Sequence, residues 1–171
     1  MIRLKPCDFE SVKSFYWDLI DAMRDRRDSV GWIKGVYPSE AMLRAALEKG
    51  ELCALVENGE YLAAVILNSS CNEDYAGVPW RLSASMEETL IPHAFAVRPD
   101  LQGKGLGRAL LSEMEELGRK AGKKAMRLDV LGRNRAAIGL YRSAGFSEIE
   151  RKNLYYDDTG WTEFVLFEKE L

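Results

Sequence analysis

A glycine-rich segment, residues 102–108, is the feature that most constrains what this chain can fold into. It contains Gly103, Gly105 and Gly107, and it joins a short apolar run, residues 91–97, to a stretch with helical periodicity. The apolar positions of that stretch are Leu110, Met114, Leu117 and Ala121. The first N–H groups of a helix lack backbone partners and carry the positive end of the helix dipole, and glycines let a ligand approach them closely. The segment therefore predicts an anion site between a strand and a helix.

Two common types of phosphate-binding loop do not fit this segment. A P-loop needs Ser or Thr directly after Gly-Lys, whereas Lys104 is followed by Gly105 and Leu106. The dinucleotide-binding pattern fails because Arg108 stands where its third glycine should be. A glycine-rich loop by itself is also compatible with a plain turn, so a second motif has to decide its role.

That second motif lies downstream, where strand, loop, helix and strand patterns follow one another over residues 128–146. The two segments read Gln102-x-x-Gly105-x-Gly107 and Asn134-x-x-Ala137-x-x-Leu140-Tyr141-x-x-x-Gly145-Phe146. This pair resembles the two signature motifs of the GNAT superfamily of acetyl-CoA-dependent N-acetyltransferases. The resemblance covers the second half of the chain, while the first half is similar to the family only in the order of its elements.

Length and composition predict one domain spanning residues 1–171. With 171 residues, 47% of them hydrophobic, the chain can bury a substantial core, and its net charge of −3 argues against a nucleic-acid partner. Apolar runs are too short to span a membrane and the N-terminus lacks the apolar region of a secretory signal, so we expect no membrane partner and a cytoplasmic location. Cys7, Cys53, Cys71 and His93 lack metal-ligand spacing, so no metal is expected.

Periodicity and turn signals predict the order of the elements. The first half reads as a short strand, two helices and a hairpin, over residues 2–6, 8–24, 39–50 and 52–68, with Asn58-Gly59 as the hairpin turn. The connection 69–90 is too long for a turn, so part of it should be ordered or functional. The second half continues with strands at 91–97, 125–131, 146–150 and 164–169, helices at 107–121 and 135–144, and a loop at 153–161.

These elements predict an α/β (α+β) fold, a single domain whose mixed central sheet of about six to seven strands is flanked by helices on both faces. The strands 91–97 and 125–131 should be parallel and joined by a right-handed crossover. The resemblance implies that a bulge splays this parallel pair, and Pro99 could not donate to a ladder in any case.

The resemblance implies acetyl-CoA as the co-substrate. Backbone N–H groups of the glycine segment would hold its pyrophosphate, Lys104 and Arg108 would add charge, and the strand end at 95–97 would pair with the pantetheine amides. Asn134 is expected near the pantetheine, although a helix N-cap explains it equally well. The expected coenzyme-binding residues are Phe95, Ala96, Val97, Gln102, Gly103, Lys104, Gly105, Leu106, Gly107, Arg108, Asn134 and Tyr141.

Acetyl transfer to an amine needs a neutral nucleophile, and deprotonating a lysine-like amine at pH 7 costs about 4 to 5 kcal/mol. Asp129 stands where ribosomal-protein alanine acetyltransferases of this superfamily place a glutamate base, although its side chain is shorter. His93, the one histidine, is the second candidate base, and Glu87 and Glu88 are weaker ones. Asp129 could instead cap a loop, and His93 could be a core or surface histidine.

Tyr141 matches the residue that serves as general acid in the family. The phenol pKa of about 10 exceeds the thiol pKa of about 8.5, so a hydrogen bond to the leaving thiolate, or concerted transfer, is the role that the resemblance implies. Tyr141 also lies on an apolar helical stripe with Ala137, Leu140 and Ala144, and core packing is therefore the alternative.

The resemblance thus implies an N-acetyltransferase that moves an acetyl group from acetyl-CoA to a small-molecule or peptide amine by direct attack in a ternary complex. A non-catalytic acyl-CoA-binding sensor or interaction module and a nucleotide-binding domain are the alternatives. Homodimers are common in the family, so one is also allowed here. Aromatic and acidic residues of the expected loops could form an acceptor pocket and attract a cation; these are Trp32, Tyr37, Trp80, Tyr155, Tyr156 and Trp161, with Glu73, Asp74, Asp157 and Asp158.

Overall fold

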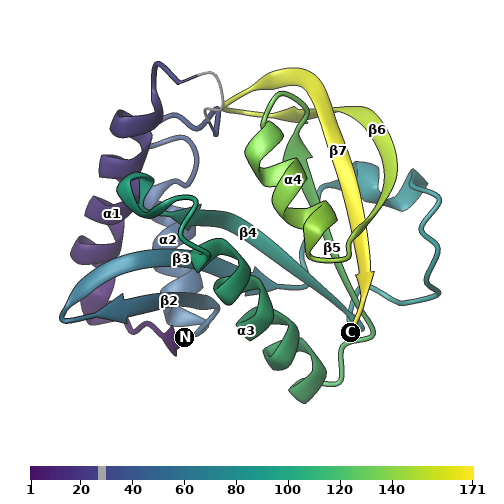
Figure 1. Ribbon diagram of the computed structural model, residues 1–171. Helices are drawn as coiled ribbons and strands as arrows, with labels where there is room; N and C mark the ends of the chain where they lie inside the picture. Colours follow the sequence, from purple (N-terminus) through teal and green to yellow (C-terminus); the bar gives the residue numbers. More distant parts are fainter. Residues whose placement is uncertain (27–29) are drawn as a thin grey trace.

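One seven-stranded sheet runs through the computed structural model, which describes residues 1–26 and 30–171 (Figure 1). Its strands are β1 (Ile2–Arg3), β2 (Leu52–Glu57), β3 (Glu60–Asn68), β4 (Thr89–Val97), β5 (Ala125–Leu131), β6 (Ser147–Tyr156) and β7 (Gly160–Glu170). The α-helices are α1 (Phe9–Met23), α2 (Glu40–Glu48), α3 (Leu106–Lys120) and α4 (Arg135–Ser143). Short 3-10 turns occupy Pro6–Asp8, Glu73–Gly77 and Pro99–Leu101.

The strand order is β1-β2-β3-β4-β5-β7-β6. Neighbouring strands are antiparallel except β4 and β5, which are parallel as the sequence predicted. The β2–β3 hairpin turns at Asn58 and Gly59, whose φ angles of 51° and 82° are those that a tight turn requires. The mixed sheet confirms the predicted fold class.

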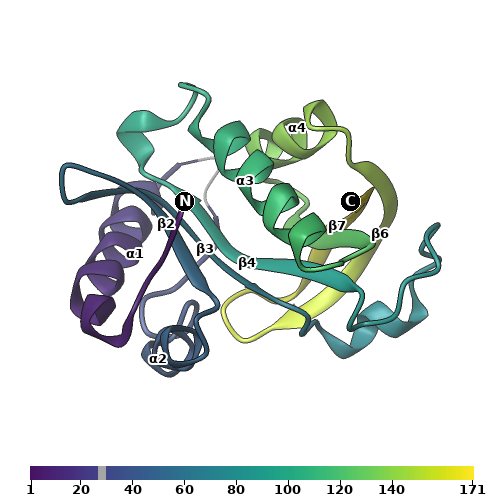
Figure 2. The same cartoon turned by 90° about the horizontal axis from the view of Figure 1, so that it is seen from below.

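Helices cover both faces of the sheet, and each face has its own apolar core (Figures 1 and 2). Alternate residues of β3 divide between them, since side chains along a strand point to opposite faces. Ala64 and Ile66 pack with α1 and α2, whereas Ala63 and Val65 pack with α3 and α4. Within the described residues, none of the helices has the length and apolar character needed to cross a membrane.

The parallel pair β4–β5 separates soon after it begins. The ladder consists of Thr89 opposite Ala125 and Leu90 opposite Met126, while β4 continues to Val97. Beyond Leu90 the two strands therefore diverge, as expected, and leave an opening in the middle of the sheet.

A β-bulge in β4 accompanies this separation. On β3, Ala64 lies opposite Ala96 and Ile66 lies opposite His93, so β4 fits one extra residue between the two pairs. Ala94 lies in that stretch and has a φ of 49°, a left-handed conformation that is uncommon for a residue with a side chain. The bulge lies a few residues past the end of the ladder at Leu90 and bends β4 in the stretch that has no partner on β5.

Two tyrosine hydroxyls form hydrogen bonds with the backbone N–H and carbonyl groups of Ala94. The Tyr16 hydroxyl on α1 donates to the carbonyl oxygen of Ala94 at 2.8 Å, and the N–H of Ala94 donates to the Tyr37 hydroxyl at 3.0 Å. An unpaired buried backbone group is costly, so these two contacts replace the ladder bonds that the bulge removes.

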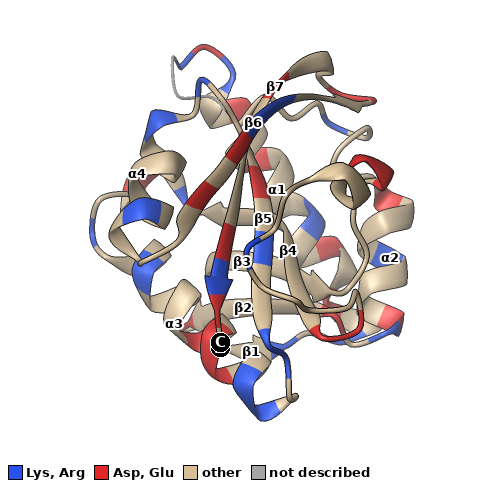
Figure 3. Ribbon diagram, turned by 90° about the vertical axis from the view of Figure 1, so that its right-hand side faces the viewer, with Lys and Arg blue, Asp and Glu red and all other residues tan. Residues whose placement is uncertain are grey.

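The prediction that residues 153–161 form a loop was wrong. The structure continues β6 to Tyr156 and starts β7 at Gly160, so Tyr155 and Trp161 are paired strand residues. The reason is that β6 is an edge strand with many charged residues (Figure 3). These residues form ion pairs such as Arg151 to Glu148, 2.8 Å apart. Because of these charged residues, the sequence lacks the alternation of apolar and polar residues that is typical of a strand. At the other end, β1 is shorter than expected because a 3-10 turn begins at Pro6.

Replacing Tyr16 by Phe should destabilise the fold by about 1–3 kcal/mol, because the buried carbonyl oxygen of Ala94 loses its hydrogen-bond donor while the ring stays in place. Urea unfolding of the two proteins measures the difference. Tyr61→Phe is the matched control, since no hydrogen bond of the Tyr61 hydroxyl occurs within residues 1–26 and 30–171. Equal stability of Tyr16→Phe and the parent chain would show that the bulge does not need this contact.

Candidate active site

A cavity of about 170 Å³ lies where β4 and β5 separate. Its walls come from both faces of the sheet, with Tyr141 of α4 on one side and Trp32 and Tyr37 on the other. Side chains with polar atoms in its lining include Trp32, Tyr37, Asn72, Tyr75, His93, Asp129, Asn134, Tyr141, Tyr156, Asp158 and Thr159. The cavity therefore passes through the opening in the sheet.

Asp129 lies on β5, on the face away from α3 and α4. Its neighbours Leu128 and Val130 point into the core under those helices, so the alternation of the strand turns Asp129 to the other side. Its carboxylate accepts hydrogen bonds from the hydroxyls of Tyr75 at 2.7 Å and Tyr156 at 2.8 Å. Burial raises the pKa of Asp129 above its ordinary value, and the two hydrogen bonds only partly offset this.

Tyr141 approaches the cavity from the opposite face. Its ring packs against Phe95, Phe146 and Phe167, with centroids 6.2, 5.5 and 5.8 Å away, and the residue is 5% exposed. In the part of the chain that the structure describes, its hydroxyl has no hydrogen-bond partner, although it lines the cavity. Burial raises the pKa of Tyr141, so the phenol stays protonated and can donate a hydrogen bond.

His93 follows the ladder on β4 and also lines the cavity. Its Nε2 lies 2.9 Å from the side-chain oxygen of Asn68 and 2.9 Å from the carbonyl oxygen of Ser70. Both partners are acceptors, so Nε2 carries the hydrogen. Burial lowers the pKa of His93, which keeps the ring neutral at pH 7.

The weaker base candidates lie elsewhere. Glu88 forms an ion pair with Lys124 and accepts a hydrogen bond from the N–H of Ser85 at 3.0 Å, and Glu87 is exposed; neither lines the cavity. Among the residues that the structure describes, no group of three or more His, Cys, Asp or Glu side chains could hold a metal ion.

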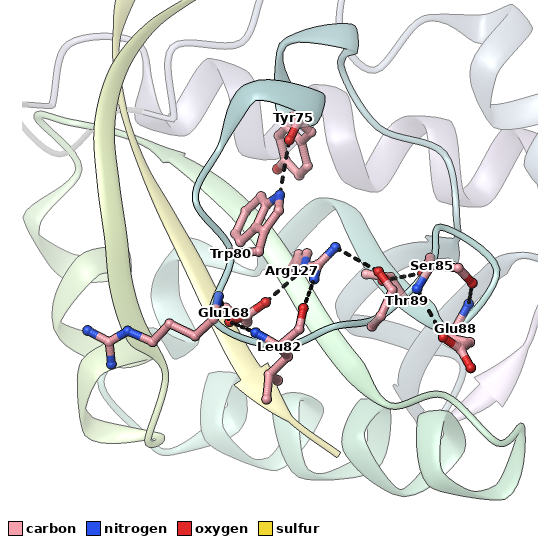
Figure 4. A network of polar contacts seen from close by, with 10 residues as sticks. Tyr75, Trp80, Leu82, Ser85, Glu88, Thr89, Arg127 and Glu168 are labelled. Atoms are coloured by element: carbon pink, nitrogen blue, oxygen red, sulfur yellow. Dashed lines mark hydrogen bonds and ion pairs between the residues drawn. The ribbon is translucent and has the colours of Figure 1, made fainter.

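The predicted connection 69–90 is ordered over the cavity and carries Tyr75. The connection as a whole shows no clear strand or helix periodicity, which is why the sequence pattern did not identify Tyr75. The Trp80 indole N–H donates to the carbonyl oxygen of Tyr75 at 3.0 Å, and the Arg127 guanidinium lies 4.7 Å from the Trp80 ring (Figure 4). Trp80 therefore links Tyr75 to the sheet.

A buried ion pair fastens this connection. Arg127 of β5 donates to Glu168 of the neighbouring strand β7 at 3.0 Å, and it also donates to the carbonyl oxygens of Leu82 and Ala84 (Figure 4). Glu168 in turn accepts from the N–H groups of Arg81 and Leu82. Both charges are thus paired and hydrogen-bonded, the condition under which a buried ion pair is tolerated.

The glycine-rich segment forms the expected turn before α3. Gly103 and Gly105 have φ angles of 79° and 86°, and a Cβ on either would meet no atom within 4 Å. Within the described residues, no side chain caps the N-terminus of α3. A Cβ on Gly107 would lie 3.0 Å from Leu140, so this glycine allows α3 to approach α4. The helix N-terminus is therefore open to an anion.

The polar side chains of this segment differ in their contacts. Arg108 donates to the carbonyl and hydroxyl oxygens of Ser143 at 3.1 and 2.8 Å, which ties α3 to the end of α4, whereas Lys104 is exposed. Gln102 donates from its side-chain amide to the carbonyl oxygen of Val97 at 3.3 Å.

The remaining coenzyme candidates flank the cavity. The side-chain oxygen of Asn134 accepts a hydrogen bond from the N–H of Ala137 at 3.1 Å, which confirms that Asn134 is the N-cap of α4. Asn134 also lines the cavity. Phe95 lies in the cavity wall, while Ala96 and Val97 pair with β3. Past Leu90, β4 has no ladder on its β5 side, so this edge is available to a ligand.

The expected acceptor aromatics divide into two groups. Trp32, Tyr37 and Tyr156 line the cavity. Trp80 lies within the connection and packs against Tyr75, and the pair Tyr155 and Trp161 lies on the outer hairpin. Of the four acidic candidates, Asp158 lines the cavity and Glu73, Asp74 and Asp157 do not.

Comparisons with known proteins agree with this geometry. The family model described as "Acetyltransferase (GNAT) family" matches residues 13–146, well over half of the chain. Among solved structures, the ribosomal-protein-alanine N-acetyltransferase of Brucella melitensis superposes with a TM-score of 0.72 at 17% identity, covering 99% of this chain and 98% of that one. A Salmonella typhimurium protein solved with its cofactor acetyl-CoA superposes with a TM-score of 0.67 at 20% identity, covering 99% and 92%.

Sequence relatives match over a shorter stretch. The [ribosomal protein bS18]-alanine N-acetyltransferase of Escherichia coli is 44% identical over 68 residues, 40% of this chain and 46% of the relative. The N-alpha-acetyltransferase RimI of Mycobacterium tuberculosis is 36% identical over 92 residues, 54% of this chain and 56% of the relative. The chain thus spans about half the length of these relatives.

Replacing Tyr156 by Phe should raise the pKa of Asp129 further, because the carboxylate loses one of its two hydroxyl donors while burial remains. A carbon-13 NMR titration of the aspartate side chains measures this shift. Tyr155→Phe is the control, since Tyr155 is 49% exposed and points away from the cavity lining. An unchanged or lower Asp129 pKa in Tyr156→Phe would contradict the described geometry.

Proposed function

Because the chain belongs to the GNAT acetyltransferase family, we propose that it transfers the acetyl group of acetyl-CoA to an amine by direct attack in a ternary complex. The observation that carries this proposal is that Asp129 and Tyr141 reach one cavity from opposite faces of the sheet, through the opening between β4 and β5. An acceptor can then enter on the Asp129 side and the thioester on the Tyr141 side.

The coenzyme would lie along the edge of β4 and the N-terminus of α3. Backbone N–H groups of residues 102–108 would hold its pyrophosphate, since the helix start is open and the glycines carry no side chain. Exposed Lys104 adds positive charge, and Arg108 adds charge from its place against Ser143. The unpaired side of β4 at Phe95 would hydrogen-bond the pantetheine amides.

Asp129 is the proposed base. A raised pKa brings its proton affinity closer to that of an amine, so the carboxylate can accept the ammonium proton at a smaller cost than an ordinary aspartate would. His93 is the second candidate, but its Nε2–H is already engaged by Asn68 and Ser70. The neutral amine nitrogen then attacks the thioester carbonyl carbon.

Tyr141 is the proposed acid. When the tetrahedral intermediate breaks its C–S bond, the electron pair goes to sulfur, and the phenol donates a hydrogen bond or its proton to that thiolate. Tyr141 suits this role because its phenol is protonated and its hydroxyl donates no hydrogen bond to any other group of the described residues. The nitrogen loses a second proton as the amide forms, and this proton ends on the coenzyme A sulfur, either directly or by restoring the Tyr141 phenol. The proton that Asp129 accepted leaves to solvent.

Relatives named for acetylation of a ribosomal-protein alanine and for L-amino acid N-acylation, the latter MnaT of Escherichia coli, support an amine as the acceptor class. Residues 1–171 as one transferase domain, a cytoplasmic location and a homodimer stay predictions.

Asp129→Asn should lower kcat/KM for thiol release from acetyl-CoA by about 100-fold or more and abolish its rise with pH, because the amide cannot accept the proton. The same variant should unfold at an equal or higher temperature at pH 7. Because the pKa of Asp129 is raised in the folded state, the folded protein loses stability as the pH rises from the unfolded-state pKa through the folded-state pKa. Asn cannot ionise, so the variant does not suffer this loss. A stable protein with full activity would exclude Asp129 as the base.

Tyr141→Phe should lower kcat by about 10- to 100-fold with little change in unfolding temperature, since the lost hydroxyl makes no hydrogen bond within the described residues. Calorimetry with coenzyme A should give the parent Kd. Undiminished turnover would reject the acid role.

A panel of amines that includes peptide N-termini separates the alternative functions. If the parent chain binds coenzyme A but releases no thiol with any of these amines, the non-catalytic module is favoured. Tighter binding of ATP than of coenzyme A would favour a nucleotide site.

A further inference from the structure

The acceptor side of the cavity carries a second carboxylate that the proposed transfer does not use. Asp158 lies in the turn between β6 and β7 and lines the same cavity as Asp129. It forms no ion pair with any described residue. Burial raises the pKa of Asp158, and hydrogen bonds from the backbone N–H groups of Asp158 and Thr159 oppose this shift. The negative charges of Asp157 and Asp129 raise the pKa as well, so the two cavity carboxylates lie within electrostatic reach.

Compensating cations are not found in the cavity wall. No Lys or Arg in residues 1–26 and 30–171 lines it, and His93 is neutral because burial lowers its pKa. Arg133 follows the end of β5 and lines an adjoining groove with Arg24 and Lys34, which shares Trp32 with the cavity. The described lining therefore offers two carboxyl groups and no cation to pair with them, so a bound acceptor is the group that can supply positive charge.

The other walls also suit a cation. The rings of Trp32 and Tyr37 lie 5.5 Å apart on the acceptor side, and the Tyr156 ring completes the wall beside Asp129. Aromatic faces attract ammonium groups and cover methylene chains. The Tyr141 hydroxyl, on a residue 5% exposed and without a partner in the described residues, marks the end of the cavity at which the chemistry occurs.

We propose, resting on the acetyl transfer inferred above, that the acceptor is a small amine with a second positive charge, which Asp158 binds while Asp129 receives the proton of the reacting nitrogen. A cavity of about 170 Å³ is small, so a short alkyl diamine fits this description better than a long one. A free amino acid would place its carboxylate beside Asp158, where like charges repel. Asp158 is thus a specificity-determining residue.

Three four-carbon acceptors test this inference by thiol release from acetyl-CoA: putrescine, n-butylamine and γ-aminobutyrate. They share the reacting amine and the methylene chain and differ at the far end, which is cationic, apolar or anionic. We expect kcat/KM for putrescine to exceed that for butylamine by about tenfold or more, with γ-aminobutyrate the poorest substrate.

Asp158→Asn should lower kcat/KM for putrescine by about tenfold and leave that for butylamine within about twofold, because the contact that is lost involves the second ammonium alone. Asp157→Asn is the matched control, since it removes the neighbouring exposed carboxylate, which lies outside the cavity. It acts on Asp158 through charge alone and should change each value by no more than about twofold.

The inference is overturned if butylamine or γ-aminobutyrate is as good a substrate as putrescine, if Asp158→Asn slows putrescine and butylamine equally, or if none of the three amines releases thiol. The last result leaves the acetyl transfer itself standing if a peptide N-terminus or another amine of a wider panel is acetylated. Failure of the whole panel, with coenzyme A still bound, would overturn the transfer as well.

Discussion

The extra residue in β4 is the feature on which the rest of the site depends. Ala94 adopts a left-handed φ, and the hydroxyls of Tyr16 and Tyr37 supply the hydrogen bonds that its backbone would otherwise lack. Because those donors and acceptors come from α1 and the segment before α2, the first half of the chain holds the bulge in place. The bulge bends β4 in the stretch beyond Leu90 that no longer pairs with β5, and the cavity lies where that pairing has stopped.

The groups around the opening are held at a cost to stability. Asp129 is buried with two tyrosine donors and no counter-charge in the described residues, a condition that favours its protonated form. Tyr75 reaches Asp129 because the connection that carries it is fastened by Arg127 and Glu168, a buried pair whose remaining hydrogen bonds all go to that connection. Such placement is typical of functional sites, where a group is kept in an environment that folding alone would not select.

Sequence patterns named most residues of the proposed coenzyme side and fewer of the proposed acceptor side. The glycine segment, Asn134 and Tyr141 lie in regular strand–loop–helix units, where spacing along the chain determines spacing in space, and the structure places them as expected around α3 and α4. The sequence pattern did not identify Tyr75, because Tyr75 lies in the connection 69–90, which has no clear periodicity. Asp158 was one of four acidic candidates, and only the fold shows that it, unlike Asp157, lines the cavity.

The sequence by itself determined the order and type of the elements, the hairpin at Asn58-Gly59 and the open helix start after Gly105, because backbone preferences and hydrophobic periodicity act between near neighbours. The tertiary structure decided which side chains share a cavity. Tyr75, Asp129 and Tyr156 come from three distant segments, and their hydrogen bonds form only once the sheet is assembled. Contacts of that kind depend on packing between segments, which no local pattern encodes.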